Sequence, residues 1–402
     1  MKLRILHVLM TVDSAYGGPV EGVRHLAKQN QAIGHTVEVA SLDCPGAADV
    51  DQMGVKVHPL GSRLSRRFNY GYSPHFVPWL RKHRNDYDCV VINGIWSYNC
   101  YGTWLALHDT SVPYFVFPHG MLDPWSKRMY PAKHMKKWLY WPWGAFPALR
   151  GARAVFFTCD EERRLARSTF WLYDCNEQVV RYGVTGCPEG LENARDAFLD
   201  AHPELRGKRL ALFLGRIHRK KGADILLRSI RTLLAEGSWD PRMMRLVLAG
   251  PLEDGPFVNG LRRFIRENGM SDIVCWTGML AGAQKWGALQ AAEVFVLPSH
   301  QENFGIAVVE ALSVGSPVLI SNAVNIWREI VEHGAGIVGD PTDRGCAAML
   351  REWLRRAPVE GAAMRRRAIG CFNECFTAKQ SADTFLSSVF MMLASPERAA
   401  HN

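Results

Sequence analysis

The amino-acid sequence predicts an α/β protein built from two doubly wound, Rossmann-like domains. In both halves of the chain, short apolar runs alternate with longer amphipathic stretches, which is the pattern of parallel strands joined by helices. The loops after several strands carry glycines, and those of the second half add cations and carboxylates. Because ligands of such sheets bind at the carboxyl ends of the strands, the same pattern predicts where the functional site lies.

Length and composition agree with this fold class. With 402 residues the chain can form two full hydrophobic cores, and its 48% hydrophobic and 22% charged composition is that of an ordinary globular protein. No apolar run approaches the roughly 20 residues that span a bilayer. The basic, apolar start of the chain has no small-residue cleavage site after it, so we predict a first strand, no export and a cytoplasmic location.

The cysteines and the net charge limit the possible functions. The ten cysteines form no C-x-x-C pair, and Cys371 and Cys375 have no histidine at zinc-site spacing in the sequence. We therefore expect reduced thiols and no metal site. The net charge of +9 favours an anionic partner such as nucleic acid, anionic lipid or a small anionic substrate. No nucleic-acid recognition module is present, which excludes the first of these classes.

The first half begins with a strand at residues 5–9, a loop at 11–19 and a helix at 20–33. Gly17 and Gly18 end that loop, where a backbone without side chains can approach a ligand phosphate. The loop has no G-x-G-x-x-G pattern, which argues against a dehydrogenase. Further strands are predicted at residues 35–41, 89–92, 114–117, 154–158 and 179–183.

Two of these strands end in polar residues that qualify as site candidates. Asn93 and Trp96 follow the strand at 89–92, and His119 and Asp123 follow the strand at 114–117. All four belong at the carboxyl edge of a parallel sheet. A lone histidine is usually structural, but at this edge we favour a functional role for His119. We regard Asn93, Trp96 and Asp123 as weaker candidates for binding an acceptor substrate.

Residues 125–153 differ from the rest of the first half. Lysine and arginine alternate with tryptophan, tyrosine and methionine, and the segment has no acidic residue. Such a mixture suits the interface of an anionic membrane. A helix that packs its aromatic residues into the core while its lysines face water fits the pattern equally well. The sequence leaves both interpretations open.

The second half follows an irregular, polar linker predicted at residues 184–208. A strand at 210–214 leads into a loop with Arg216 and Lys221, and a helix starts at 223. A guanidinium and an ammonium group at this edge match a diphosphate, although solvated loop charges are the alternative. Strands at 245–249 and 273–276 follow, and Thr277 and Met279 lie in the turn after the latter. An amphipathic helix is predicted at 378–393.

The stretch 294–322 is the most informative part of the chain. It predicts a strand at 294–297, a polar loop, a helix at about 306–314 and a strand at 318–320. Backbone amides and the helix dipole at residues 303–307 would attract a phosphate. Glu302 in the loop and Glu310 in the helix would repel that phosphate, so we interpret both as acceptors for sugar or ribose hydroxyl groups.

Glu302 and Glu310 form an E-x7-E pattern that is followed by an alanine–leucine pair and a Gly-Ser-Pro-Val turn. This stretch resembles the retaining glycosyltransferases of family 4 (glycosyltransferase group 1), which have the GT-B fold. The Gly-Arg-x4-Lys-Gly spacing at 215–222 strengthens the resemblance, which covers the whole chain and is weaker in the first half. It implies two Rossmann-like domains facing a central cleft. The acceptor-side domain would span 1–184 with a returning C-terminal helix at about 385–402, and the nucleotide-sugar domain 185–384.

The resemblance also implies roles for the candidate residues. Gly18 would face the donor diphosphate, and His119 the transferred sugar. Arg216 and Lys221 would bind the diphosphate, Glu302 the sugar hydroxyls and Glu310 the ribose. The remaining expected donor contacts are Thr277, Met279, Asn303, Phe304, Gly305 and Ile306. The chain departs from its relatives at Val91 and Asn93, where they often have histidines, and at Tyr182, where an asparagine often precedes Gly183.

The expected activity is therefore retaining transfer from a UDP- or GDP-sugar without a metal ion. The two Asp-x-Asp sequences, at 49–51 and 86–88, are interpreted as solvated charges. The basic segment 125–153, with Arg63, Arg66 and Arg67, suggests peripheral binding to the inner membrane face and a lipid-linked oligosaccharide acceptor in surface polysaccharide synthesis. A GT-B sugar-nucleotide epimerase and a soluble transferase with a small acceptor are the alternatives. A glycoside hydrolase would not need Arg216 and Lys221.

Overall fold

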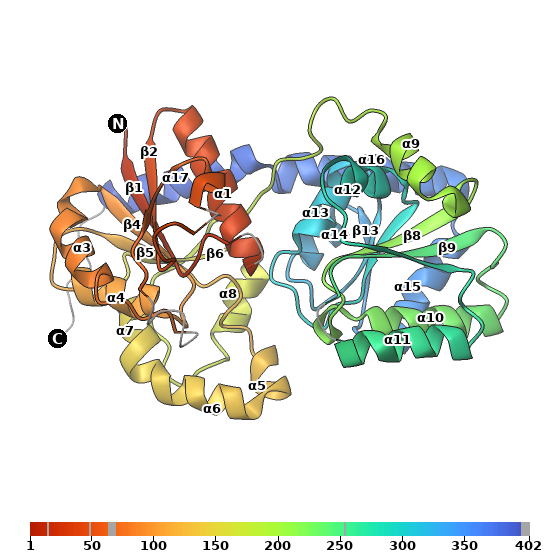
Figure 1. Cartoon of the computed structure of the whole chain (residues 1–402), viewed down its shortest axis with the longest axis horizontal. Helices are drawn as coiled ribbons and strands as arrows, with labels where there is room; N and C mark the ends of the chain where they lie inside the picture. Colours follow the sequence, from red (N-terminus) through yellow and green to blue (C-terminus); the bar gives the residue numbers. More distant parts are fainter. Residues whose placement is uncertain (14–15, 48–49, 63–69, 253–254, 395–402) are drawn as a thin grey trace. The chain divides into compact units, whose positions relative to one another are not determined.

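The computed structural model describes residues 1–13, 16–47, 50–62, 70–252 and 255–394, and they form two compact units (Figure 1). The N-terminal unit consists of Met1–Gly183 and Ala378–Asn402, and the C-terminal unit consists of Val184–Thr377. The chain thus returns to the N-terminal unit through its last helix, which joins that unit from Ala378 instead of the expected position near 385. Within the described residues, no helix has the length and apolar character of a membrane span.

The N-terminal unit contains a seven-stranded sheet with the order β3-β2-β1-β4-β5-β6-β7. All neighbouring strands are parallel, and Ile5 of β1 lies opposite both Val37 of β2 and Cys89 of β4. The strands are β1 (Arg4–Leu9), β2 (Thr36–Ser41), β3 (Lys56–Pro59), β4 (Cys89–Asn93), β5 (Tyr114–Phe117), β6 (Ala154–Phe157) and β7 (Glu177–Val179).

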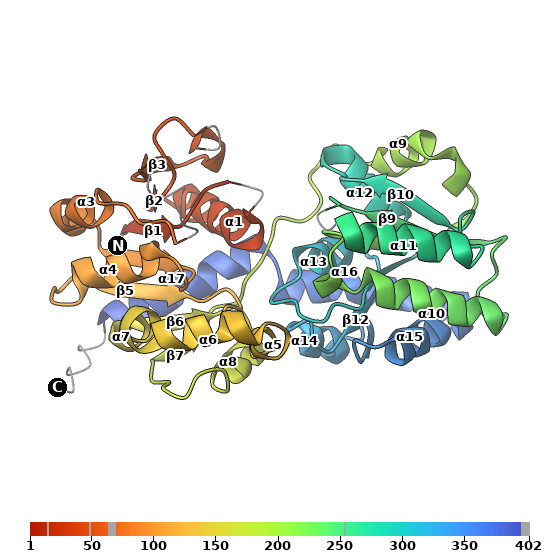
Figure 2. The same ribbon diagram turned by 60° about the horizontal axis from the view of Figure 1, so that its bottom comes forward.

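Helices cover both faces of this sheet (Figure 2). One core contains Leu26 and Ala27 of α1 with Phe385 and Leu386 of α17, while the other contains Phe76 of α3 and residues of α4 and α7. Burying two apolar faces explains why the strands are almost uninterrupted apolar runs. The helices are α1 (Gly18–Ala32), α3 (Phe76–His83), α4 (Tyr98–Leu107), α5 (Trp125–Met129), α6 (Pro131–Tyr140), α7 (Phe146–Gly151), α8 (Asp160–Ala166) and α17 (Ala378–Ala394).

The C-terminal unit contains a six-stranded parallel sheet with the order β10-β9-β8-β11-β12-β13. Its strands are β8 (Arg209–Leu214), β9 (Met244–Ala249), β10 (Val274–Gly278), β11 (Val294–Leu297), β12 (Val318–Ser321) and β13 (Gly336–Gly339). Its helices are α9 (Ala194–Ala201), α10 (Ala223–Ala235), α11 (Gly255–Glu267), α12 (Gly282–Ala291), α13 (Ile306–Ser313), α14 (Trp327–Glu332), α15 (Asp343–Arg355) and α16 (Pro358–Cys375).

Two of the predicted segments differ in the structure. The irregular linker expected at 184–208 contains the helix α9, whose Phe198 is fully buried. Gly287 of α12 makes this packing possible, because a β-carbon there would lie 2.1 Å from the Ala194 carbonyl oxygen. The last strand of the N-terminal sheet is β7, so the strand expected at 179–183 is present but begins two residues earlier and ends at Val179.

Candidate functional site

The order of the C-terminal sheet reverses between β8 and β11, which are neighbours in space although β9 and β10 separate them in the sequence. The loops after these two strands meet at the carboxyl edge, where open α/β sheets bind ligands. The backbone amide of His300 donates to the Lys220 carbonyl at 2.8 Å, and the Ser299 hydroxyl donates to the same oxygen at 2.9 Å. A β-carbon on Gly222 would lie 2.2 Å from the Pro298 carbonyl oxygen, so the close approach of the loops requires glycine there.

Lys221 and Glu302 form an ion pair between these two loops. Each side chain is only 16% exposed, so solvent screens the pair less than it screens a surface pair. The Glu302 backbone is held on both sides: its amide donates to the Ala323 carbonyl at 2.9 Å, and its carbonyl accepts from the Asn325 amide at 2.9 Å. The structure thus brings together two residues predicted to bind the donor.

The predicted anion site lies directly after Glu302. Gly305 has a φ of 76° and is the N-cap of α13. It makes no side-chain hydrogen bond to the first turn, so no cap side chain occupies the backbone N–H groups there. The side-chain oxygen of Asn303 accepts a hydrogen bond from the side-chain amide of Asn325 at 3.3 Å. Phe304 is buried, with its ring 5.9 Å from that of Phe376, and its side chain therefore anchors the loop instead of facing a ligand.

Glu310 has a partner that the sequence did not reveal. The Lys285 ammonium of α12 lies 2.6 Å from the Glu310 carboxylate, and the Glu310 side chain is 12% exposed. Lys285 also lies 4.8 Å from the centre of the Trp286 ring. A single lysine on a helix carries no sequence signal, and only the packing of α12 against α13 identifies it.

The other donor-site candidates of this unit lie at or after the ends of strands in the same sheet. Arg216 is exposed in the loop after β8, and Met279 after β10 is 75% exposed. The Thr277 hydroxyl donates to the adjacent Gly278 carbonyl at 3.3 Å. Because β8, β9 and β10 are neighbours, these residues lie along one edge of the sheet. Their contacts with a donor remain predictions.

In the N-terminal unit, the structure connects His119 to Asn93. The Asn93 amide nitrogen lies 3.2 Å from the Val91 carbonyl and 3.4 Å from the Val8 carbonyl, which identifies it as the donor end. Its oxygen must then accept from Nε2 of His119, at 3.0 Å. His119 thus carries its proton on Nε2 and keeps Nδ1 as an acceptor. Burial, with a smaller contribution from His7, lowers the pKa of His119 to about 3, so the ring is neutral at physiological pH.

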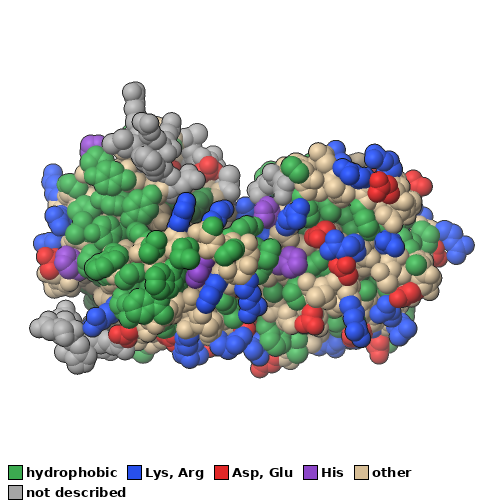
Figure 3. All heavy atoms as spheres, turned by 90° about the horizontal axis from the view of Figure 1, so that it is seen from below, with side chains coloured by type: hydrophobic (Ala, Val, Ile, Leu, Met, Phe, Trp, Pro, Cys, Tyr) green, Lys and Arg blue, Asp and Glu red, His purple; other side chains and the backbone are tan. Residues whose placement is uncertain are grey.

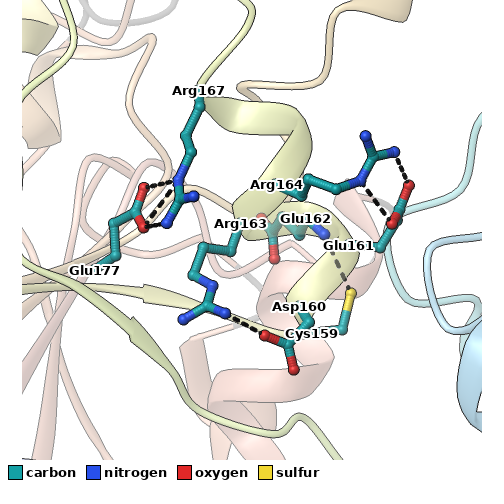
Figure 4. Close-up of polar contacts among 8 residues, drawn as sticks. All are labelled: Cys159, Asp160, Glu161, Glu162, Arg163, Arg164, Arg167 and Glu177. Atoms are coloured by element: carbon teal, nitrogen blue, oxygen red, sulfur yellow. Dashed lines mark hydrogen bonds and ion pairs between the residues drawn. The ribbon is translucent and has the colours of Figure 1, made fainter.

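A buried carboxylate supports the turn at His119. His119 has a φ of 51°, the only positive φ among the described residues other than glycine. The next amide, that of Gly120, donates to Glu162 at 2.5 Å, and the amide and hydroxyl of Thr158 donate to the same carboxylate at 2.7 Å each. Glu162 lies in the first turn of α8, whose neighbouring acids pair with arginines instead (Figure 4).

Gly18 lies close to the same edge. It begins α1, and its carbonyl accepts a hydrogen bond from the Tyr182 hydroxyl at 3.2 Å. The Tyr182 ring stands edge-on to His119 with the ring centres 6.0 Å apart. A β-carbon on Gly22 would overlap the Tyr182 hydroxyl, so that glycine admits the ring. Tyr182 stands where the sequence of relatives led us to expect asparagine, and it links Gly18 to His119.

The three weaker acceptor-site candidates make structural contacts. Asn93 is 4% exposed and uses both ends of its amide within the protein. The Trp96 indole donates to the Met121 carbonyl at 3.1 Å, and its ring packs near Phe170. Asp123 accepts from the Trp125 amide at 2.8 Å in front of α5. Asn93 therefore positions His119. For Trp96 and Asp123, the contacts within the protein account for the placement of both side chains without a ligand.

The basic, aromatic segment divides into an exposed part and a packed part. Helices α5 and α6 contain no buried residue, whereas Trp141 and Phe146 after them belong to the core. Exposed fractions reach 60% for Met135 and 62% for Leu139. Figure 3 shows apolar side chains gathered on this face of the N-terminal unit, with lysine and arginine side chains beside them. Arg63, Arg66 and Arg67 lie outside the described residues.

An apolar groove accompanies the exposed part. It has a volume of about 680 Å³ and lies between α6 and the segment after α8. Its apolar lining consists of Pro131, Met135, Trp138, Phe170 and Trp171, and Lys127 lies beside them.

The second Asp-x-Asp sequence lies at the amino edge of the N-terminal sheet. Asp88, just before β4, accepts from the Arg4 amide at 2.6 Å, and Asp86 lies 2.9 Å from His83. The first such sequence begins outside the described residues, at Asp49.

Family models match both units of the chain. The model for glycosyl transferases group 1 matches residues 195–368, and that for a glycosyl transferase 4-like domain matches residues 17–182. Solved structures of low identity share the fold. A structure of Anabaena Alr3699/HepE in complex with UDP and glucose has a TM-score of 0.74 at 15% identity and covers 97% of this chain and 100% of that one. A sucrose-phosphate synthase from Thermosynechococcus elongatus has a TM-score of 0.74 at 17% identity, with coverages of 98% and 100%.

Curated relatives align over different lengths. A D-inositol 3-phosphate glycosyltransferase of Kineococcus radiotolerans is 32% identical over 192 residues, 44% of each chain. The chain spans about half the length of such enzymes, 53% in the case of Thermomonospora curvata. A GDP-mannose:cellobiosyl-diphosphopolyprenol alpha-mannosyltransferase of Xanthomonas campestris is 27% identical over 345 residues, 84% of this chain and 83% of that one. These matches agree with the GT-B fold that the sequence predicts.

Proposed function

The chain belongs to the group 1 glycosyl transferases, and we propose that it transfers a sugar from a nucleotide-sugar donor to a saccharide acceptor carried on a lipid. The observation that carries the proposal is the meeting of Lys221, Glu302 and the α13 N-terminus at the point where the sheet order reverses. Cations, carboxylates and backbone amides together suit a diphosphate that carries hydroxyl-rich groups. Structural neighbours in complex with UDP and UDP-glucose support this donor class.

We assign the donor-site roles by charge and position. Arg216, Lys221 and the amides at the start of α13 would stabilise the negative charge that develops on the departing diphosphate. Glu302 would hold hydroxyl groups of the transferred sugar, and Glu310 those of the ribose. Because Lys285 already pairs with Glu310, it would hold that carboxylate ionised and ready to accept a hydrogen bond.

For His119 we propose contact with the sugar through Nδ1, which the Asn93 contact leaves as an acceptor. A neutral ring can accept a hydrogen bond from a hydroxyl group, whereas an imidazolium cannot. The proposed stereochemistry is retention by front-face attack within an ion pair. No residue among the donor-site candidates is assigned as a covalent nucleophile.

We propose that catalysis needs no metal ion, because Arg216 and Lys221 supply the positive charge that a cation would provide. The position of Asp86 and Asp88 at the amino edge supports this proposal. Activity should persist after chelation. Loss of activity that magnesium or manganese restores, and zinc does not, would contradict it.

The exposed helices and the groove support a lipid-linked acceptor at a membrane surface. In α6, Met135, Trp138 and Leu139 lie at helical spacing on one exposed side, and Lys133 and Lys136 are exposed beside them. Apolar side chains would enter the interface of an anionic bilayer while the lysines bind lipid phosphates. One relative, the mannosyltransferase of Xanthomonas campestris, has a lipid-linked acceptor, cellobiosyl-diphosphopolyprenol, in its name. We place the enzyme in the cytoplasm, peripherally on the inner membrane face, in surface polysaccharide synthesis.

A soluble transferase with a small acceptor is the second candidate. It is favoured by a mannosylfructose-phosphate synthase of Agrobacterium fabrum, which is 23% identical over 350 residues, 82% of this chain and 76% of that one. A sugar-nucleotide epimerase would share the donor site but would make no glycosidic bond.

Two experiments in sequence test the proposed function. Thermal stabilisation by a panel of UDP-, GDP- and ADP-sugars identifies the donor, since specific ligands raise apparent stability. The selected donor, radiolabelled, is then incubated with a lipid-linked oligosaccharide and with free sugar phosphates. Label in the lipid extract supports the proposal, and label only in sugar phosphates favours the soluble transferase. Conversion of the donor without any acceptor would indicate an epimerase.

A further inference from the structure

A histidine and two cysteines meet where α14 contacts α16 in the C-terminal unit. His333 directly follows α14, and Cys371 and Cys375 lie one turn apart in α16. One ring nitrogen of the histidine and the two Sγ atoms lie within 4.8 Å of one another. Both thiols are buried, and the histidine is partly buried. The sequence concealed this cluster because His333 lies far from the cysteine pair along the chain.

Two separations around His333 match those of ligands around one zinc ion. Zinc binds sulfur at about 2.3 Å and nitrogen or oxygen at about 2.0–2.2 Å, so tetrahedral geometry separates S and N by roughly 3.6 Å and N and O by roughly 3.4 Å. The distance from His333 Nε2 to Cys375 Sγ is 3.7 Å. The distance from the same nitrogen to the Glu374 carboxylate is 3.3 Å. Two thiols and an imidazole thus fit three positions of a tetrahedral site, and the exposed Glu374 side chain beside His333 can turn to supply the fourth.

The orientation of His333 is set by its other ring nitrogen. Nδ1 lies 2.8 Å from the Glu329 carbonyl oxygen, which can only accept, so Nδ1 carries a proton. Nε2 lies 3.3 Å from the Glu374 carboxylate and donates its proton to it when no metal is bound, and zinc would replace that proton. Metal-binding histidines are commonly oriented by a hydrogen bond of this kind.

We propose that His333, Cys371 and Cys375 bind one Zn²⁺, with Glu374 as the fourth ligand. Binding forms two Zn–S bonds, one Zn–N bond and one Zn–O bond, and the two thiol protons and the proton on His333 Nε2 go to solvent. No oxidation or reduction is involved. The site would fasten α14 to α16 next to Phe376, whose ring contacts that of Phe304 in the donor loop. The ion would stabilise the fold and take no part in transfer, and the inference does not depend on the proposed function.

Metal content and a spectroscopic probe test the site directly. The full-length protein, purified without chelator and dialysed against metal-free buffer, should contain about one zinc per chain. After zinc removal, Co²⁺ should give the intense visible bands of tetrahedral cobalt with thiolate charge-transfer absorption in the near ultraviolet. Zinc competition should abolish these bands.

Matched variants separate this cluster from others. Cys371→Ala/Cys375→Ala should lose zinc and the cobalt bands, and Glu374→Gln should weaken zinc affinity at least about tenfold. Cys346→Ala removes a buried thiol elsewhere in the unit and should bind zinc normally. Cys275→Ala removes the thiol of a second cluster, with His202 and Glu204, and should also bind normally. Absence of zinc and of tetrahedral cobalt bands in the wild type would overturn the proposal, as would unchanged binding in the double variant.

Discussion

Lys221 and Glu302 form an ion pair that joins the loops after β8 and β11. Each neutralises the other in the absence of a ligand, and both are only 16% exposed. A diphosphate that binds Lys221 must therefore displace or share this carboxylate. The two residues are therefore coupled in donor binding. This coupling determines whether nucleotide affinity should rise or fall in the variants of the next two predictions.

Replacing Glu302 by alanine should abolish transfer while nucleoside diphosphate binding is kept. The carboxylate is proposed to contact the sugar, and an interaction made chiefly in the transition state appears in turnover instead of ground-state affinity. Removing the competitor of the diphosphate for Lys221 also favours binding. Calorimetry and turnover assays measure the two effects, with exposed Glu332→Ala as a control of wild-type activity. A variant that loses its nucleotide affinity as well would show that Glu302 has a different role.

Arg216→Ala and Lys221→Ala should each weaken nucleoside diphosphate binding by about 1.5–3 kcal/mol, the size of a charge-assisted hydrogen bond. In Lys221→Ala, the unpaired Glu302 carboxylate would add repulsion toward the phosphates. We therefore expect Lys221→Ala/Glu302→Ala to bind more tightly than Lys221→Ala alone. Calorimetric titration of the four combinations gives the coupling energy. Strict additivity at this pair would mean that the ion pair and the diphosphate do not compete.

The Asn93 contact predicts a single tautomer for His119. The ¹⁵N spectrum of the imidazole should show a proton on Nε2 and none on Nδ1 at neutral pH. The signal should not titrate between pH 7.5 and 5, because burial lowers the pKa of His119 to about 3. Asn93→Ala removes the partner of Nε2 and should produce a mixture of tautomers and a lower kcat. His119→Asn tolerates the left-handed backbone and identifies the signal. A ring that titrates near pH 6.5 would contradict this arrangement.

Two histidines with lowered pKa values should make the protein sensitive to acid. Burial lowers the pKa of His7 to about 3, as it does for His119. The unfolded chain therefore binds more protons between about pH 6.5 and 3, so stability is full above 6.5 and falls as the pH decreases. The slope approaches about 1.4 kcal/mol per pH unit for each histidine. His119 is partly exposed, so His7, which is fully buried, should contribute most of this pH dependence.

Urea unfolding at pH 7.5, 6 and 5 measures this effect. His7→Gln keeps a polar group beside Asn93 but cannot take up a proton, so its free energy of unfolding should depend less on pH than that of the wild type. Equal pH dependence in the two proteins would show that His7 does not cause the acid sensitivity.

The sequence predicted most strands and the loops that carry Lys221 and Glu302, because buried parallel strands and glycine-bounded turns are local patterns. It could not predict partners that only packing brings together. Lys285 reaches Glu310 from α12, Glu162 reaches Gly120 from α8, and His333 meets Cys375. The sequence also could not predict the role of Asn93, for the same reason. Its place at a strand end suggested an acceptor contact, but its burial gives it the task of orienting His119.

The last prediction concerns the face formed by α5, α6 and the apolar groove. We expect the protein to sediment with anionic vesicles and not with neutral ones, and high salt should release it. Each lysine near an anionic surface contributes about 1 kcal/mol, and the attraction fades beyond a Debye length of about 8 Å at physiological salt. Lys133→Glu/Lys136→Glu should therefore abolish binding at physiological salt. Lys137 is left unchanged because its ammonium lies 4.6 Å from the centre of the Trp96 ring, and its replacement would disturb packing.

Two control variants distinguish electrostatic attraction to the vesicle from insertion of apolar side chains into the bilayer. Lys28→Glu/Lys82→Glu changes the net charge equally at exposed positions of the same unit and should leave most binding intact. Met135→Ser/Leu139→Ser keeps every charge and removes two exposed apolar side chains, 60% and 62% exposed. If these side chains enter the bilayer, this variant should bind more weakly even at low salt, since burying apolar surface contributes about 25 cal/mol per Å². If both charge-reversal variants lose binding equally, the attraction comes from net charge alone. Failure of the wild type to bind anionic vesicles at low salt would exclude the membrane role, and sugar transfer would remain to be tested with free acceptors.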